Sequence, residues 1–142
     1  MTSRRALLSV YNKDGIADFA ARLHALGFAH SVEVWDEEGA LIGGLYGVSI
    51  GRVFCGESMF HRAADASKVA FAVLARQLER WEFAFLDCQL YTPHLARLGA
   101  TTWDRADYLA RLAEVVRAPS RRGRWSLDEA LAQGWQADPA AP

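Results

Sequence analysis

The sequence predicts an α+β fold, in which helices pack on a mixed α/β sheet. Two observations lead to this prediction. Three short strand-like runs follow one another between residues 31 and 55, and after residue 65 helical periodicity is interrupted by one more buried-strand run. The 142 residues are 51% hydrophobic, which is enough to bury the core of a single globular domain.

The chain is predicted to begin with a strand and a helix. Ala6–Val10 is a short apolar run, and the helix after it ends at Gly27, a residue typical of helix C-termini. The apolar positions of this helix recur at helical spacing and are Ile16, Phe19, Ala20 and Leu23.

Antiparallel strands are expected next. Ser31–Trp35 alternates polar and apolar residues, as a half-buried strand does. Asp36–Gly39 has the composition of a turn, so Ser31–Trp35 and Leu41–Val48 are predicted to form a hairpin. Gly51–Cys55 is expected to add a third antiparallel strand.

The second half is predicted to contain a long helix, a strand and two further helices. Asp65 is expected to cap the long helix, and the strand covers Phe83–Leu86. A short helix begins at Thr92–Pro93 and ends at Gly99. The apolar stripe of the long helix comprises Ala70, Val73, Leu74, Leu78 and Trp81, and the core face of the last helix comprises Leu109, Leu112, Ala113 and Val116. Packing signals fade from Ser120 onward, so much of the tail is expected to be mobile.

Polar side chains follow two of the predicted strands. Gly56–Phe60 comes after the third strand, and Asp87–Gln89 comes after the later one. If these two strands pair, Glu57 converges with Asp87 and Gln89 on one opening, where carboxylates are typical of a functional site. The alternative is that the apolar residues of Gly56–Phe60 belong to the core and that Glu57 is a solvated loop acid.

Composition and motifs argue against several classes of protein. The net charge of -1 provides no overall basic field, so any contact with RNA would be local. The four histidines fall into no metal-ligand spacing and no GxSxG or Cys-His signature is present, so neither a metal nor a covalent serine intermediate is expected. Ser58–Lys68 contains no glycine, which argues against a coenzyme A site. With no membrane span or signal peptide, we expect a soluble cytoplasmic protein in which Cys55 and Cys88 are free thiols.

Seven blocks of the sequence share their order and spacing with one known family. They are Arg22–Trp35, Gly43–Val48, Gly56–Phe60, Ala66–Lys68, Asp87–Gln89, His94–Leu95 and Leu98–Ala100. From about residue 22 to 116 the chain resembles the C-terminal domain of leucyl/phenylalanyl-tRNA-protein transferases. The resemblance implies a GNAT-like acyltransferase fold without a cofactor. It also implies two partners, since this family moves Leu or Phe from aminoacyl-tRNA to the N-terminal Arg or Lys of an acceptor protein and so marks that protein for degradation.

The resemblance also implies which residues form the site. The catalytic pair of the family matches Asp87 and Gln89, and Glu57 lies at the edge of the cleft with Ser58 beside it as a substrate-binding residue. The pocket for the apolar amino acid matches Leu45, Phe54, Met59, Phe71 and Leu74. His61 stands where the family usually has a serine.

Residues 4–20 resemble a different family. Arg5–Ile16 is similar to the opening strand, loop and helix of the IMP cyclohydrolase domain of the bifunctional purine-biosynthesis protein. Ser9 and Lys13 match nucleotide-contacting positions of that family, but we expect them to have a structural role here, because so short a segment cannot form a nucleotide site. We therefore expect a strand-helix segment at 1–21, a transferase domain at 22–118 and a flexible tail at 119–142. Because the N-terminal domain of the transferase family has no counterpart in this sequence, the alternative is a non-catalytic truncated or fused remnant with weak ligand or tRNA binding. A fragment of a purine enzyme is the third interpretation.

Overall fold

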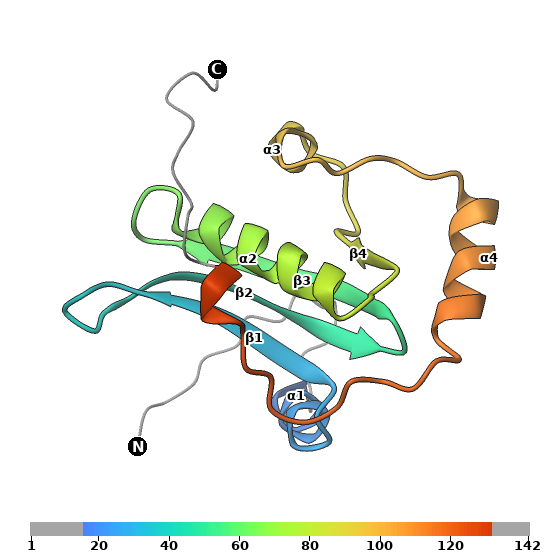
Figure 1. Cartoon of the computed structure of the whole chain (residues 1–142), viewed down its shortest axis with the longest axis horizontal. Coiled ribbons are helices and arrows are strands. Elements are labelled where there is room, and N and C mark those ends of the chain that lie inside the picture. The colour runs from blue at the N-terminus through green and yellow to red at the C-terminus, as the bar shows by residue number, and fades with distance from the viewer. Residues whose placement is uncertain (1–15, 132–142) are drawn as a thin grey trace.

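The computed structural model describes residues 16–131 and shows a mixed α+β fold built on one four-stranded sheet (Figure 1). The strands are β1 (Ala29–Trp35), β2 (Leu41–Ile50), β3 (Val53–His61) and β4 (Phe85–Asp87), and they lie in that order across the sheet. The first three are antiparallel, and β4 pairs parallel to β3. The predicted α+β class is confirmed, whereas the predicted strand Ala6–Val10 lies outside the described residues.

The β1–β2 hairpin forms as its turn residues predict. The Asp36 carboxylate accepts hydrogen bonds from the backbone N–H groups of Glu38 at 3.1 Å and Ala40 at 2.7 Å. Gly39 has φ +79°, in the left-handed region that glycine enters without steric cost. The turn chemistry is local, so the sequence was sufficient to locate it.

Four α-helices and one short 3₁₀ helix complete the fold. They are α1 (Ile16–Ala25), α2 (Ala66–Arg80), α3 (Pro93–Arg97), α4 (Arg105–Val115) and η1 (Glu129–Leu131) within the described part of the chain. Helix α2 crosses one face of the sheet, and α4 lies beyond the β4 edge (Figure 1). The predicted C-terminus of α1 at Gly27 is confirmed, because Gly27 has φ +78°. The predicted start of α3 at Thr92 is also confirmed, because the Thr92 hydroxyl accepts a hydrogen bond from the Leu95 N–H.

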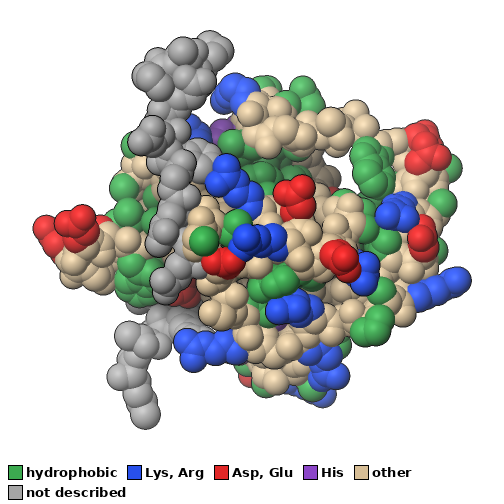
Figure 2. Space-filling model, in the orientation of Figure 1, with side chains coloured by type: hydrophobic (Ala, Val, Ile, Leu, Met, Phe, Trp, Pro, Cys, Tyr) green, Lys and Arg blue, Asp and Glu red, His purple; other side chains and the backbone are tan. Residues whose placement is uncertain are grey.

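The core lies between α2 and the sheet. Its central cluster comprises Val32, Leu45, Phe54, Ala70, Leu74 and Leu78. The α2 stripe is therefore the one predicted from helical periodicity. On the surface seen in Figure 2, acidic and basic side chains are interspersed, in keeping with the near-zero net charge.

Two predicted boundaries differ from the structure. Strand β3 continues to His61, so Gly56–Phe60 lies within a strand and not after it. Asp65 precedes α2 but makes no side-chain cap, because it adopts φ 62° and its carboxylate pairs with Lys68 instead.

The predicted core face of α4 is also wrong. Leu109 is 41% exposed and Val116 is 37% exposed, whereas Val115 is 6% exposed. The helix meets the rest of the molecule at the β2–β3 turn, where the Arg52 N–H donates to the Val115 carbonyl at 3.1 Å. This contact turns Val115, and not Leu109, toward the interior.

Residues 120–131 pack on the core, in contrast to the mobility predicted for the tail. Trp125 stacks on His30 with ring centroids 3.7 Å apart and meets Trp81 edge-on at 4.9 Å. The Ser120 hydroxyl accepts a hydrogen bond from the Gly51 N–H at 2.8 Å. The division of the chain near residues 21 and 118 stays a prediction.

Among residues 16–131, no helix is long and apolar enough to cross a membrane.

Candidate functional site

The candidate site forms where β3 and β4 stop pairing. Their parallel ladder has three pairs and ends at Cys55 opposite Asp87. Immediately after it, the pairing of β3 with β2 shifts, since Gly47 lies opposite Gly56 and Tyr46 opposite Ser58. Glu57 is the extra residue of this bulge. A bulge redirects the side chains around it, which explains why simple alternation did not extend β3 through this stretch.

The three predicted polar residues converge at this point. The Gln89 side-chain amide donates from Nε2 to Glu57 Oε1 at 3.1 Å, across 32 positions of sequence. The Gln89 backbone N–H donates to Asp87 Oδ1 at 2.7 Å. The predicted convergence of Glu57, Asp87 and Gln89 is therefore confirmed as geometry. Glu57 is exposed, as the alternative of a solvated acid expects, but it lies within β3 and not in a loop.

Tyr108 completes this group and was missed by the sequence analysis. Its hydroxyl, carried by α4, donates to Asp87 Oδ2 at 2.7 Å. The hydrogen bond to Asp87, followed by burial, raises the pKa of Tyr108 to about 12, so the phenol stays protonated at neutral pH. The available signal was helical spacing, because Tyr108 lies seven residues before the buried Val115 and so shares its face.

The nearby thiols are poorly suited to act as nucleophiles. Burial, and then the carboxylates of Asp87 and Glu57, raise the pKa of Cys55 to about 11. Burial and Asp87 also raise the pKa of Cys88. Because the thiolate is the reactive form, Cys55 stays largely protonated and unreactive at neutral pH.

Tyr46 is a second polar group that sequence reasoning missed. Its hydroxyl is buried and has no hydrogen-bond partner among the described residues. Burial and the Glu57 carboxylate raise its pKa. Ser58, a predicted substrate-binding residue, is half-buried and pairs with Tyr46 in the β2–β3 ladder.

The five predicted pocket residues belong to one apolar cluster. Leu45, Phe54 and Leu74 are 6%, 1% and 0% exposed and form part of the core, and Met59 and Phe71 are half-buried against it. The structure thus brings all five together, with Met59 and Phe71 nearer the surface.

The apolar cluster and the polar group lie on opposite faces of the sheet. Phe54 and Leu86 are paired in register and pack in the core under α2. The next pair is Cys55 and Asp87, and neighbouring residues of a strand point to opposite faces. Asp87 therefore points away from α2, toward α4, where Tyr108 contacts it.

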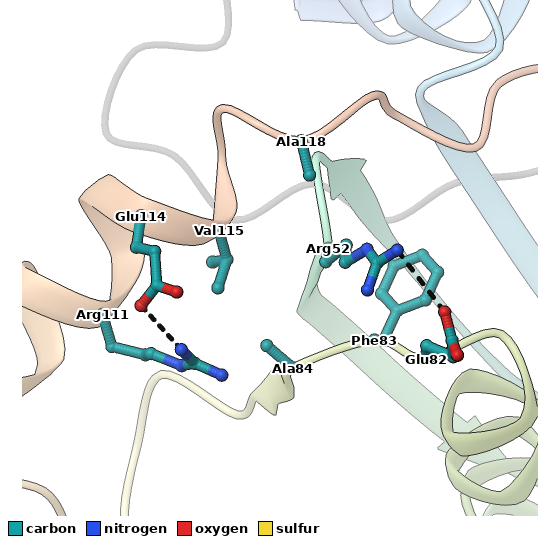
Figure 3. Close-up of a pocket in the computed structure, with 8 residues that line it drawn as sticks. All are labelled: Arg52, Glu82, Phe83, Ala84, Arg111, Glu114, Val115 and Ala118. Carbon is teal, nitrogen blue, oxygen red and sulfur yellow. Dashed lines mark hydrogen bonds and ion pairs between the residues drawn. The ribbon is translucent and has the colours of Figure 1, made fainter.

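A surface hollow of about 550 Å³ lies beside α4 but is separate from this site (Figure 3). Two ion pairs line it, Arg52 with Glu82 at 3.4 Å and Arg111 with Glu114 at 2.6 Å. No predicted site residue lines it, and its charges balance. Within residues 16–131, no group of three or more His, Cys, Asp or Glu side chains is arranged to hold a metal ion.

Comparison with known proteins places these features in a family. Residues 12–113 match the sequence model of the leucyl/phenylalanyl-tRNA protein transferase family, so the match begins ten residues before the predicted start and includes α1. A leucyl/phenylalanyl-tRNA–protein transferase of Thiobacillus denitrificans is 60% identical over 107 residues, which are 75% of this chain and 46% of that protein.

Two further relatives carry the same name. The protein of Myxococcus xanthus is 53% identical over 117 residues, 82% of this chain and 47% of the relative. That of Nitrosospira multiformis is 56% identical over 106 residues, 75% of this chain and 45% of the relative. The chain thus spans about half the length of the curated relatives it matches. The family match covers most of the chain and includes the convergent residues Glu57, Asp87 and Gln89. The chain therefore belongs to the leucyl/phenylalanyl-tRNA protein transferase family.

Proposed function

We propose that this protein transfers Leu or Phe from aminoacyl-tRNA to the N-terminal Arg or Lys of acceptor proteins and so directs them to degradation. The observation that carries the proposal is the convergence of Asp87, Gln89 and Glu57 where β3 and β4 separate, in a chain that belongs to this family. The names of the relatives supply the aminoacyl donors and the protein acceptor.

The polar group has the chemistry that aminolysis of an ester requires. The acceptor amine attacks the ester carbonyl, the new amide bond forms, the bond to the tRNA ribose breaks, and one proton moves from the amine to the ribose oxygen. Because Gln89 donates from Nε2 to Glu57, its side-chain carbonyl oxygen is left to orient the attacking amine. The carboxylates of Glu57 and Asp87 suit a cationic Arg or Lys at the acceptor terminus.

The apolar cluster under α2 suits the Leu or Phe side chain of the donor. Leu45, Phe54 and Leu74 form a buried floor, and Met59 and Phe71 are the members nearer to solvent. The β3–β4 ladder ends at Cys55 and Asp87, and the next residue on β3 is Gly56, which has no side chain. We propose that the acyl group reaches the cluster through this break in the sheet while the amine stays on the Asp87 face.

This arrangement supports a GNAT-like classification of the fold. The supporting features are three antiparallel strands, a helix across one face, and a fourth strand that runs parallel to β3 and pairs with it over only three residues. The site opens where the pairing ends, which is where a parallel pair of strands commonly positions ligands.

A transfer assay tests the proposal directly. The chain is incubated with radiolabelled Phe-tRNA and an acceptor peptide that begins with Arg, and labelled peptide is measured. We expect transfer that Glu57→Gln lowers on the order of tenfold, because the amide loses the negative charge that faces the acceptor. Glu37→Gln is the matched control, since Glu37 is exposed in the β1–β2 turn and the same chemical change there is expected to leave transfer unchanged.

The alternative of a non-catalytic family member predicts a different result. In that case the chain binds Phe-tRNA or an apolar ligand weakly and gives no labelled peptide above a control without enzyme. Circular dichroism on the same preparation shows whether the protein is folded, so absence of transfer by a folded protein overturns the proposed activity.

A further inference from the structure

Gln89 adopts a backbone conformation that needs support. Its φ is 62°, in the left-handed region that non-glycine residues seldom enter because the Cβ approaches the backbone too closely there. Strain of this kind persists only where neighbouring groups hold it. Here the Gln89 N–H donates to Asp87 Oδ1 at 2.7 Å, so the carboxylate two residues earlier stabilises the bent backbone.

The Asp87 side chain must itself be held in place. It is the last residue of β4, a strand of only three residues, and Gln89 occupies only one of its two carboxylate oxygens. The other oxygen accepts the Tyr108 hydroxyl at 2.7 Å, in a partly buried position. Hydrogen bonds to a carboxylate are about twice as strong as those between neutral groups, so this contact restrains the rotation of the Asp87 side chain.

Tyr108 is itself held in place from two sides. Its ring packs edge-on against Phe85 of β4 with centroids 5.9 Å apart. The helix that carries it is capped by Asp104, whose carboxylate accepts the Ala106 N–H at 2.8 Å. The phenol also stays protonated near neutral pH, because its pKa is raised to about 12, and so it remains a donor.

We propose that Tyr108 is a positioning residue for the transfer site: its hydrogen bond fixes Asp87, which holds Gln89 in the left-handed conformation that aims the Gln89 amide at Glu57. Tyr108 acts through Asp87 and need not touch the substrate. This inference rests on the proposed function for its effect on transfer. The geometric part, from Tyr108 to Gln89, is measurable without any turnover.

The first test measures hydrogen exchange of backbone amides by NMR in Tyr108→Phe, which removes the hydroxyl and keeps the ring. We expect the backbone amide of Gln89 to exchange about tenfold faster, which corresponds to the loss of one charge-assisted hydrogen bond. The backbone amides of core residues such as Leu74 should keep their exchange rates. Equal acceleration at Leu74 would mean global destabilisation and overturn the proposal, as would an unchanged Gln89 rate. In a chain that already carries Asp87→Ala, Tyr108→Phe is expected to have no further effect on Gln89.

The second test measures transfer kinetics with Phe-tRNA and an Arg-initiated peptide. We expect Tyr108→Phe to lower kcat about tenfold with little change in the KM for the peptide, because the acceptor contacts remain while their alignment is lost. Tyr91→Phe, at a side chain 65% exposed, is the matched control and should leave both constants unchanged. A wild-type chain without transfer would refute the proposed function, whereas the exchange rates of Gln89 would still decide the role of Tyr108.

Discussion

Replacing Trp125 by alanine is expected to destabilise the protein strongly, although Trp125 lies in the stretch that the sequence predicts to be mobile. The Trp125 ring stacks on His30, meets Trp81 edge-on at 4.9 Å, and lies 5.8 Å from the ring of Phe54. Its Nε1 donates to the Arg121 carbonyl at 3.0 Å. Trp125 is therefore the aromatic centre of the contact between segment 120–131 and the core, where Leu127 also packs.

The magnitude follows from these contacts. Removing a fully buried aromatic side chain costs about 3–5 kcal/mol, and Trp125 is half-buried, so about half of that applies. Loss of the hydrogen bond from Nε1 adds about 1 kcal/mol. We expect Trp125→Ala to lower the free energy of unfolding by about 2.5–3.5 kcal/mol.

Urea unfolding followed by circular dichroism measures this change. With a slope of about 2 kcal/mol/M, the midpoint should fall by about 1–2 M. Trp35→Ala is the control, because Trp35 is 51% exposed on β1, and it should cost about 1 kcal/mol or less. Equal effects of the two substitutions, or a loss below about 0.5 kcal/mol for Trp125→Ala, would refute the packing of this segment on the core.

Two further predictions concern the break in the sheet and the buried histidine. Gly56→Val should fold normally, because a Cβ at this position lies 3.5 Å from the Asp87 carbonyl, which is an ordinary contact. Transfer of Phe in the radiolabel assay should nevertheless fall on the order of tenfold or more, because the branched side chain fills the proposed acyl path. Full activity would contradict that path. Burial lowers the pKa of His30 from 6.5 to about 4, so between these pH values the unfolded state binds more protons than the folded state. The contribution of neutral His30 to the free energy of unfolding is therefore complete above pH 6.5 and is lost as the pH falls toward 4. Between pH 7 and 4.5, the free energy of unfolding measured with urea should therefore fall by about 2 kcal/mol more for the wild type than for His30→Phe. Parallel curves would contradict the buried neutral imidazole.

The sequence was informative wherever the determining residues are close together in the chain. The Asp36 turn, the Gly27 helix end and the Thr92 cap are all set by groups within five residues of one another, and all three were predicted. The α2 stripe was also predicted, because a helix presents its apolar residues at a regular period regardless of its partner. The pairing of Asp87–Gln89 with Glu57 followed once two strands were assumed to be neighbours.

What the sequence could not determine depended on contacts between distant segments. The bulge at Glu57 arises from the pairing of β3 with β2, so no period within β3 alone indicates that the strand continues to His61. The buried face of α4 depends on the β2–β3 turn, which meets Val115 across some sixty residues of sequence. The sequence predicted Trp125 to lie in a mobile tail because its packing partners lie in other segments of the chain.

The sequence by itself thus determined the family, the order of the elements and the three residues Asp87, Gln89 and Glu57 of the candidate site. Only the tertiary structure decided how these residues are held, since the strained Gln89 backbone and the hydrogen bond from Tyr108 to Asp87 exist only when α4 lies beside β4. The physical reason is that local propensity and periodicity are properties of neighbouring residues. The alignment of a carboxylate to within hydrogen-bond distance depends instead on the packing of segments that the chain brings together only on folding.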